Sequence, residues 1–346
     1  MEHKPIKTIF LMLLIFAAAC DEPETVVTNI IHTDGSVTRK IEMRNTKNKF
    51  DKSVVQVPID STWSVKDSIS IGVKNDTTWF KTAEKSFKNV EEINGEYLNE
   101  NGANRKIPRS ASFTRKFRWF NTVYTFSEKL DKSLLSGYPL EKFMTKDELD
   151  FFYLPESIIT EKLSGADSTK YKEMNNSIKT KTDRCFWSSA VSEWIEEFSK
   201  LTAGRGDEKF TKEKLKLLES KIVDTIIVFE PKGDSVIYAI LGTRGYKNFK
   251  AEADSAEAIV DKRLEPNISF AGYTVIFVMP GRVTASNGFI MRNGEIMWPV
   301  KSEFFMSQTY EMHAESKMPN VWAWVVSGLF LLFVLTGTLW TINKKG

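Results

Sequence analysis

The chain has 346 residues, of which 42% are hydrophobic and 12% aromatic, enough for one large folded domain or two ordinary ones. Its formal net charge is +3, but only four of the 48 basic and one of the 45 acidic residues lie in residues 1–19 and 320–346. The body between these ends is therefore electrically balanced. Without a general basic field, nucleic-acid binding is excluded as the function.

The N-terminal segment, residues 1–19, has the pattern of an export signal. Lys4 and Lys7 precede an apolar run that is too short to cross a membrane, and three alanines end at Ala19. With Cys20 next, the segment resembles a bacterial lipoprotein signal, although alanine stands where leucine is commonest. The resemblance implies signal cleavage between Ala19 and Cys20 and lipid attachment, such as palmitate, at Cys20. The alternative is an ordinary signal peptide that is cleaved nearby, with Cys20 incidental.

The C-terminal segment at 320–342 predicts a transmembrane helix. Residues 321–342 carry no charge and, at ~1.5 Å per residue, span ~33 Å, enough to cross a ~30 Å hydrocarbon core. We expect its membrane-interface anchors to be the following residues at its two ends: Trp322, Trp324, Trp340, Lys344 and Lys345. Because lysines favour the cytoplasmic side, the tail at 343–346 is expected inside the cell and the body outside it.

An acidic tether at 20–25 joins the signal to the body. Asp21 after the cysteine resembles the inner-membrane retention signal of enterobacterial lipoproteins, while acidic residues there also resemble the surface-export signals of Bacteroidetes. The C-terminal helix decides between them, because apolar helices belong to inner membranes and outer membranes are spanned by barrels. We expect a protein of the bacterial inner (cytoplasmic) membrane that is anchored at both ends, with its body on the periplasmic side.

Residues 26–139 predict a β-rich part. Asp34-Gly35 between two β-rich runs at 26–31 and 37–43 is typical of a hairpin. Further strands are predicted at 53–59, 63–65, 69–73 and 77–82, followed by one long aromatic strand at 113–126.

Residues 140–222 predict a helical insertion. Thr145 and Glu148 have the spacing of a capping box, which opens a short helix. The helical period returns from 168 to 201, with these residues on one face: Trp187, Val191, Trp194, Ile195 and Phe198. A further helix is predicted at 212–222.

Residues 223–319 predict a second β-rich part. Strands are expected at 224–229, 236–241, 269–279, 283–289, 290–298 and 303–314, with one helix at 250–264. Asn293-Gly294 predicts a second tight hairpin. The expected fold class is therefore α+β: an antiparallel β-rich body with a helical insertion and one C-terminal transmembrane helix.

The residues that usually carry catalysis or bind metals are scarce. After removal of the signal only His32 and His313 remain, and neither lies in a metal-spaced pair or beside a cysteine. Cys185 is then the sole thiol apart from Cys20, and its helical, aromatic surroundings predict burial. No nucleotide-binding or hydrolase motif occurs, so we expect no cofactor, no metal and no catalytic residue, although an acid–base pair among the carboxylates stays an alternative.

One local excess of positive charge stands out in this balanced body. It comprises Arg105, Lys106, Arg109, Arg115, Lys116 and Arg118, and no acidic residue occurs from 105 to 127. On a continuous strand, Lys116 and Arg118 would share a face with Tyr124, and Arg115 would lie on the other. This segment is a candidate surface for anionic headgroups or a glycan. The simpler interpretation, which we favour, is an edge strand whose charges prevent aggregation.

The last strands resemble LppM-type domains of bacterial lipoproteins and membrane proteins. The resemblance is carried by a motif of six residues: Met279, Pro280, Gly281, Asn287, Gly288 and Trp298. It covers about 40 residues and implies a β-rich extracytoplasmic body with one C-terminal transmembrane helix. For some members it also implies lipid or glycolipid binding. Taken singly, Pro280-Gly281 and Asn287-Gly288 are turn residues and Trp298 is a core residue.

These observations predict a membrane-anchored cell-envelope lipoprotein that binds a lipid-like ligand or a membrane-protein partner without catalysis. A structural or assembly subunit that docks a protein partner through the helical insertion is the main alternative. An apolar cavity in the β body would favour the first, and an exposed apolar stripe on the helix at 168–201 would favour the second.

Overall fold

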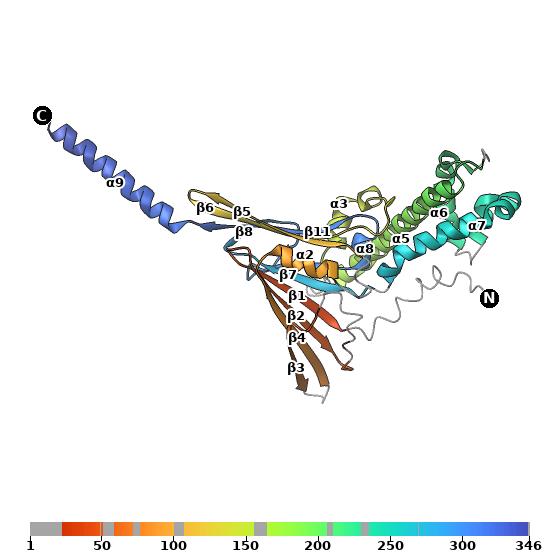
Figure 1. Ribbon diagram of the computed structural model, residues 1–346, viewed down its shortest axis with the longest axis horizontal. Coiled ribbons are helices and arrows are strands. Elements are labelled where there is room, and N and C mark those ends of the chain that lie inside the picture. Colours follow the sequence, from red (N-terminus) through yellow and green to blue (C-terminus); the bar gives the residue numbers. More distant parts are fainter. Residues whose placement is uncertain are drawn as a thin grey trace.

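The computed structural model describes residues 23–48, 50, 59–71, 77–99, 107–155, 165–205, 210–229, 235–268 and 270–344. Figure 1 shows an elongated molecule with a β-rich body in the middle, a single helix projecting from one end and a group of helices at the other. The α+β class is confirmed. The predicted signal and tether up to residue 22, including Ala19 and Cys20, lie outside the described residues.

The N-terminal hairpin is confirmed. Strands β1 (Glu24–Ile31) and β2 (Val37–Asn45) pair antiparallel, with Ile31 opposite Val37. Between them the Asp34 carboxylate accepts hydrogen bonds from the Ser36 amide and hydroxyl, and Gly35 has a φ of 93°. Only glycine adopts such an angle without strain, which explains why Asp-Gly marks this turn.

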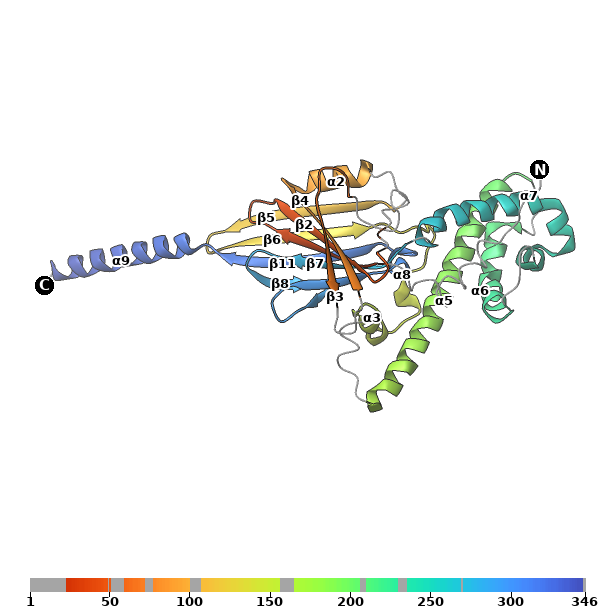
Figure 2. The same ribbon diagram turned by 90° about the horizontal axis from the view of Figure 1, so that it is seen from below.

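Eleven strands in the described residues form two sheets (Figure 2). The first, sheet A, runs in the order β3 (Ser64–Ile71), β4 (Thr77–Phe87), β2, β1, β7 (Tyr273–Val278), β10 (Ile296–Val300) and β9 (Phe289–Ile290). The second, sheet B, runs in the order β5 (Arg109–Arg118), β6 (Asn121–Leu130), β11 (Tyr310–Pro319) and β8 (Arg282–Ser286). Only the β1–β7 pair is parallel; after β7 the chain passes to sheet B, back to sheet A and again to sheet B.

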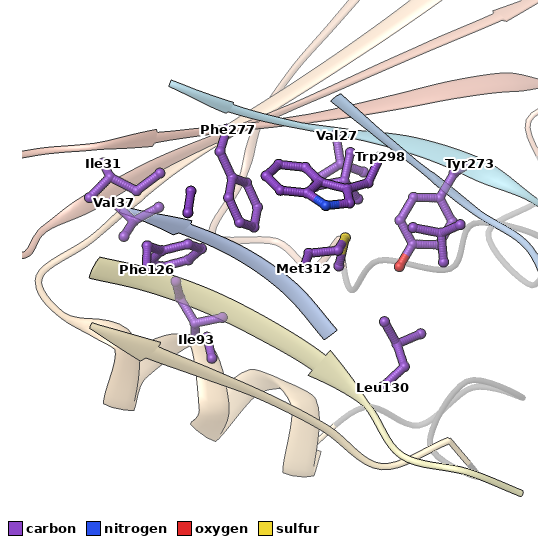
Figure 3. Packing of buried hydrophobic residues seen from close by; sticks show 14 of the residues in the cluster. Val27, Ile31, Val37, Ile93, Phe126, Leu130, Tyr273, Phe277, Trp298 and Met312 are labelled. Atoms are coloured by element: carbon purple, nitrogen blue, oxygen red, sulfur yellow. The ribbon is translucent and has the colours of Figure 1, made fainter. Parts of the chain in front are cut away.

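Aromatic rings from the two sheets fill the space between them (Figure 3). The Phe126 ring from sheet B meets the Phe277 ring from sheet A edge to face, with centroids 4.8 Å apart, and Phe277 lies 4.5 Å from Trp298. All three side chains are almost completely buried. Burial of each such side chain stabilises the fold by about 1.5–3 kcal/mol, so this packing contributes strongly to the association of the two sheets.

A buried polar network also joins the sheets. Arg39 on β2 donates to Asn29, to the Tyr97 hydroxyl at 2.6 Å and to Glu128 on β6 at 3.0 Å. Tyr97 lies on α2 (Val90–Asn99) and donates in turn to Glu128. Burial opposes the charge on Arg39, but Tyr97 and Glu128 outweigh it and raise its pKa; burial also raises the pKa of Tyr97 well above 10. The guanidinium therefore stays charged and the phenol stays a donor.

The helical part is larger than the sequence predicts. It comprises a 3-10 turn (Leu140–Lys142), α3 (Lys146–Phe152), α5 (Gly165–Leu201), α6 (Lys212–Phe229) and α7 (Ser235–Ile268), which bends at Gly242. The capping box of Thr145 and Glu148 is present. The predicted apolar face of α5 is confirmed, because Ile195 and Phe198 are fully buried in the helical core.

Two predicted strands, 224–229 and 236–241, are wrong because both segments are helical. The run at 224–229 is rich in β-branched residues, yet Val223 and Ile226 are buried while Val228 is 68% exposed. That pattern follows the helical period, which a short apolar run does not reveal by itself. Strand structure therefore resumes only at Tyr273, beyond the predicted boundary at 222.

Three other predictions need correction. The single long strand at 113–126 is a hairpin of β5 and β6 that turns at Trp119-Phe120, without a glycine or proline to signal it. The strand at 303–314 starts instead as a short helix, α8 (Ser302–Phe305). Residues 64–65 and 69–71 of two predicted strands belong to one strand, β3, while residues 53–58 and 72–73 lie outside the described part. The Asn293-Gly294 hairpin of β9 and β10 is confirmed.

The buried network generates the first prediction. Arg39→Met leaves the Glu128 carboxylate buried without its cation and is expected to lower the free energy of unfolding by about 3–5 kcal/mol. Arg39→Met combined with Glu128→Met removes both charges and is expected to be less destabilised than Arg39→Met alone. Urea unfolding of the full chain in detergent, followed by circular dichroism, measures both; an equal or larger loss in the double variant would contradict the buried pair.

Candidate membrane-interface site

Helix α9 (Val321–Asn343) projects from the end of the β body that lies opposite the helical part (Figures 1 and 2). Its residues Val321–Trp340 have a mean hydropathy of 1.9, and only 6% of this stretch is buried. Large apolar side chains such as Phe333 are therefore exposed along its length. In the described residues this is the one helix whose length and composition suit a membrane crossing. The predicted helix is therefore present, and most of its side chains are exposed.

Asn320 fixes the start of α9 to the turn between β5 and β6. Its amide donates to the Phe120 carbonyl at 3.0 Å, and its side chain donates to the Arg118 carbonyl at 2.7 Å. The same side chain accepts a hydrogen bond from the Thr122 hydroxyl at 2.9 Å. Residues 117–122 are called the hairpin tip below. Backbone and side chain of Asn320 both bind the hairpin tip, so it is joined directly to the start of the helix.

Five aromatic side chains close over this junction, and we call them the aromatic clamp: Phe117, Trp119, Phe120, Trp322 and Trp324. Phe117 stacks on Trp322 with ring centroids 6.2 Å apart, and the Phe120 ring lies 4.4 Å from that of Trp324. The Trp119 indole donates to the Ser327 hydroxyl at 2.9 Å. All five side chains remain between 40% and 57% exposed, so they form a partly exposed aromatic cluster at the first turns of α9.

The remaining predicted interface anchors lie at the far end of α9. Trp340 is 63% exposed, and the Lys344 ammonium lies 4.0 Å from the centre of its ring. Lys345 lies outside the described residues. A tryptophan with a lysine at one end and two tryptophans at the other is the arrangement typical of helices whose ends meet membrane–water interfaces.

The predicted cationic segment is divided by the structure. Arg109 is buried, with its guanidinium 5.7 Å from the Tyr97 ring, so it belongs to the core and not to a surface. Arg115, Lys116 and Arg118 are exposed on β5, which is an edge strand of sheet B. Tyr124 lies opposite Arg115, so its predicted place on the face of Lys116 is wrong. Arg105 and Lys106 lie outside the described residues.

Three motif residues form the crossing from sheet A to sheet B. Met279 is buried at the end of β7, and the Pro280 carbonyl accepts a hydrogen bond from Ser316 on β11 at 2.7 Å. Gly281 has a φ of 77°, and a Cβ there would lie 2.5 Å from the Lys317 carbonyl oxygen. Both conditions require glycine, so this part of the motif positions β8 beside β11.

The other three motif residues form the crossing back to sheet A. The Asn287 side-chain oxygen accepts from the Trp298 indole at 3.0 Å and from the His313 amide at 2.8 Å. Its nitrogen donates to the Glu311 carbonyl at 2.6 Å. Gly288 lies against the Trp298 ring, where a Cβ would be 2.3 Å from the nearest ring atom. The interpretation of each motif residue as a turn or core residue accounts for all of these contacts. The motif is therefore a structural link between the two sheets.

The described part of the chain has no metal-binding cluster, and its free thiol is buried. No cluster of three or more histidine, cysteine or acidic side chains there has the geometry to hold a metal ion. Cys185 is buried as predicted, its thiol donates to the Tyr138 carbonyl at 3.4 Å, and burial raises its pKa. A protonated, buried thiol is a poor nucleophile.

Sequence reasoning missed the aromatic clamp as a unit. Phe117, Trp119 and Phe120 are prominent in the cationic segment, and Trp322 and Trp324 are prominent in the helix, but about 200 residues separate the two groups. The available signal was the density of aromatic residues beside positive charges and free of acids. Interpreting residues 113–126 as one strand hid the turn that brings the two groups together.

Gly288 supports a second prediction. Gly288→Ala forces the Trp298 ring to move and is expected to destabilise the protein by about 1–3 kcal/mol, the usual range for overpacking. Gly95→Ala is the matched control, because a Cβ there meets nothing within 4 Å and alanine favours helix α2 by about 0.5–1 kcal/mol. Chemical unfolding of both variants tests the contrast. Equal stability of the two variants would contradict the close contact with Trp298.

Comparisons with known proteins add little to this geometry. No protein-family model and no curated protein matches the chain. Among solved structures, the chain is similar to the folded domain of LppM from Mycobacterium tuberculosis, at 8% identity and a TM-score of 0.29, over 87% of this chain and 92% of that one. A likeness of this size is too weak to place the chain in a family.

Proposed function

We propose that this chain is a non-catalytic, membrane-anchored envelope lipoprotein that binds a lipid-like ligand or a membrane partner at its membrane-facing end. The observation that carries the proposal is the aromatic clamp, which fixes the β body to the first turns of α9. A body joined in this way keeps one defined end against the lipid. A helix that serves only as a tether needs no such contacts.

The proposed topology combines both ends of the chain. The export signal and an acylated Cys20 place the body outside the cytoplasm, and α9 returns the chain across the inner membrane with Lys344 and Lys345 inside. Trp322 and Trp324 then lie at the outer interface, where amphipathic rings are favoured. The hairpin tip lies at the same level, because Asn320 binds it directly.

The membrane-facing end is a better ligand surface than the space between the sheets. Phe126, Phe277 and Trp298 already occupy the middle of the body, ring against ring. A lipid chain in that position would have to displace them at a cost of several kcal/mol. The exposed rings of the clamp need no such displacement.

One observation favours the assembly subunit as a second candidate. The predicted apolar face of α5 is buried within the helical part, but Leu217 and Val228 on α6 are 84% and 68% exposed. They are eleven residues apart and therefore lie on nearly the same side of the helix. This side of α6, far from α9, is the place for a protein partner (Figure 1).

Acylation and anchoring are tested together. Cys20→Ala is expected to abolish labelling by radioactive palmitate while the protein stays in the membrane fraction, because α9 still holds it. Removal of residues 321–346 is expected to leave labelling intact. Unchanged labelling of Cys20→Ala would refute the lipoprotein assignment, and a Cys20→Ala variant found in the soluble fraction would refute α9 as an anchor.

Ligand binding is tested on the full chain, purified from membranes in mild detergent. Native mass spectrometry is expected to show lipid retained by the protein, and Leu217→Ser with Val228→Ser is expected to leave this lipid unchanged. A bare protein mass that gains nothing from added envelope lipids would refute lipid binding. Loss of a co-purified protein in the α6 variant would support the assembly subunit instead.

A further inference from the structure

The register of sheet B gathers positive charge at its membrane-facing end. Lys116 lies opposite Val123, which lies opposite Lys317 on β11, and Lys317 lies opposite Arg282 on β8. Side chains in one such row point to the same face of a sheet, and Arg118, two residues beyond Lys116, shares that face. We call these four side chains the cationic patch: Lys116, Arg118, Arg282 and Lys317.

The patch has little compensating charge. No acidic residue occurs at 105–127, at 266–294 or after Glu315, and these segments supply the strand ends that meet here. Glu315, two residues before Lys317, lies 3.8 Å from its ammonium. Within the described residues, Lys116, Arg118 and Arg282 are exposed and form no ion pair. A chain whose body is balanced overall has thus concentrated unpaired cations at one end.

Contacts along α9 give the depth of this end relative to the membrane. Ser327, which binds the Trp119 indole, is six residues beyond Val321 and therefore ~9 Å further along the helix axis. With α9 across the bilayer, Trp119 reaches into the interfacial layer beside the helix. Arg118 is adjacent to it, and Lys116 is two residues further back. Rings at the acyl boundary with cations just outside them match the layering of a lipid surface, where phosphates lie above the chains.

From this layering we infer that the hairpin tip is a second membrane contact, with the cationic patch binding the phosphates of anionic lipids in the leaflet that α9 enters. The inference rests on the proposed anchoring by α9 and goes beyond it, because it assigns a headgroup chemistry to named residues. Lys116 and Arg118 alternate along β5 with Phe117 and Trp119, whose rings contact Trp322 on α9, so an anion that reaches the patch lies close to the plane in which α9 enters the membrane.

Hydrogen exchange of the full chain in lipid nanodiscs tests the inference. One disc contains phosphatidylcholine alone and the other also contains about one third phosphatidylglycerol, a proportion that gives a strongly negative surface potential. Amides at 115–122 are expected to exchange at least about tenfold more slowly in the anionic disc, because three unpaired cations hold the tip down. Amides of α9 are expected to be protected equally in both discs.

Two charge variants sharpen the result. Lys116→Gln, Arg118→Gln and Arg282→Gln together are expected to abolish the difference between the discs. Lys66→Gln, Lys88→Gln and Lys129→Gln together remove the same charge away from the tip and are expected to preserve it. Unchanged exchange of the β6–β11 amides shows that both variants keep the fold.

The outcomes separate this inference from the proposed function. Protected α9 amides with no lipid-dependent protection at 115–122 would overturn the inference and leave the anchoring intact. Unprotected α9 amides would overturn both. Protection of 115–122 in native membrane vesicles but in neither disc would assign the tip to a protein partner and would also overturn the lipid contact.

Discussion

Asn320 makes the connection on which the proposed arrangement of this molecule at a membrane depends. Its four hydrogen bonds to the hairpin tip join the last strand, the β5–β6 turn and α9 at a single point. The five rings of the aromatic clamp add contacts between the same two segments. A transmembrane helix attached through a free linker would leave the body to tumble above the lipid. Here the end of sheet B and the start of the helix form one unit, and the helical part is carried at the opposite end.

A small number of close contacts also holds the two sheets together. The last third of the chain passes between the sheets three times, and each motif glycine lies where a side chain would strike the neighbouring strand or Trp298. Asn287 satisfies backbone groups of β11 and the indole of β10 with one amide. The buried Arg39–Tyr97–Glu128 network adds a polar link between the sheets, and loss of one charged partner would leave the other buried and uncompensated. These contacts fix sheet B to the rest of the body, as the proposed membrane-facing end requires.

Local turn chemistry and long-range periodicity were predictable from the sequence, whereas contacts between distant segments were not. Asp34-Gly35, Asn293-Gly294 and the Thr145 capping box each specify their conformation within a few residues, and all three are present. The apolar run around Ile226 is compatible with either a strand or a helix. It forms a helix because its apolar side chains are buried in the core shared with α5. The turn at Trp119-Phe120 has no residue that favours a turn; Asn320, two hundred residues away, stabilises it. The site could be predicted as separate halves, a cationic aromatic segment and a tryptophan-flanked helix, but not as one surface.

A fixed connection between the body and α9 is measured most directly by pulsed electron paramagnetic resonance. Spin labels at Thr114 on β5 and Leu335 on α9, in a Cys185→Ser chain reconstituted into nanodiscs, report the distance between two exposed positions on either side of the clamp. If Cys20 is acylated it takes no label, and it is replaced by alanine in a parallel sample. A single narrow distance distribution is predicted, and Trp322→Ala with Trp324→Ala is expected to broaden it. A broad distribution in the unaltered clamp would show that α9 is only a tether and would contradict the account.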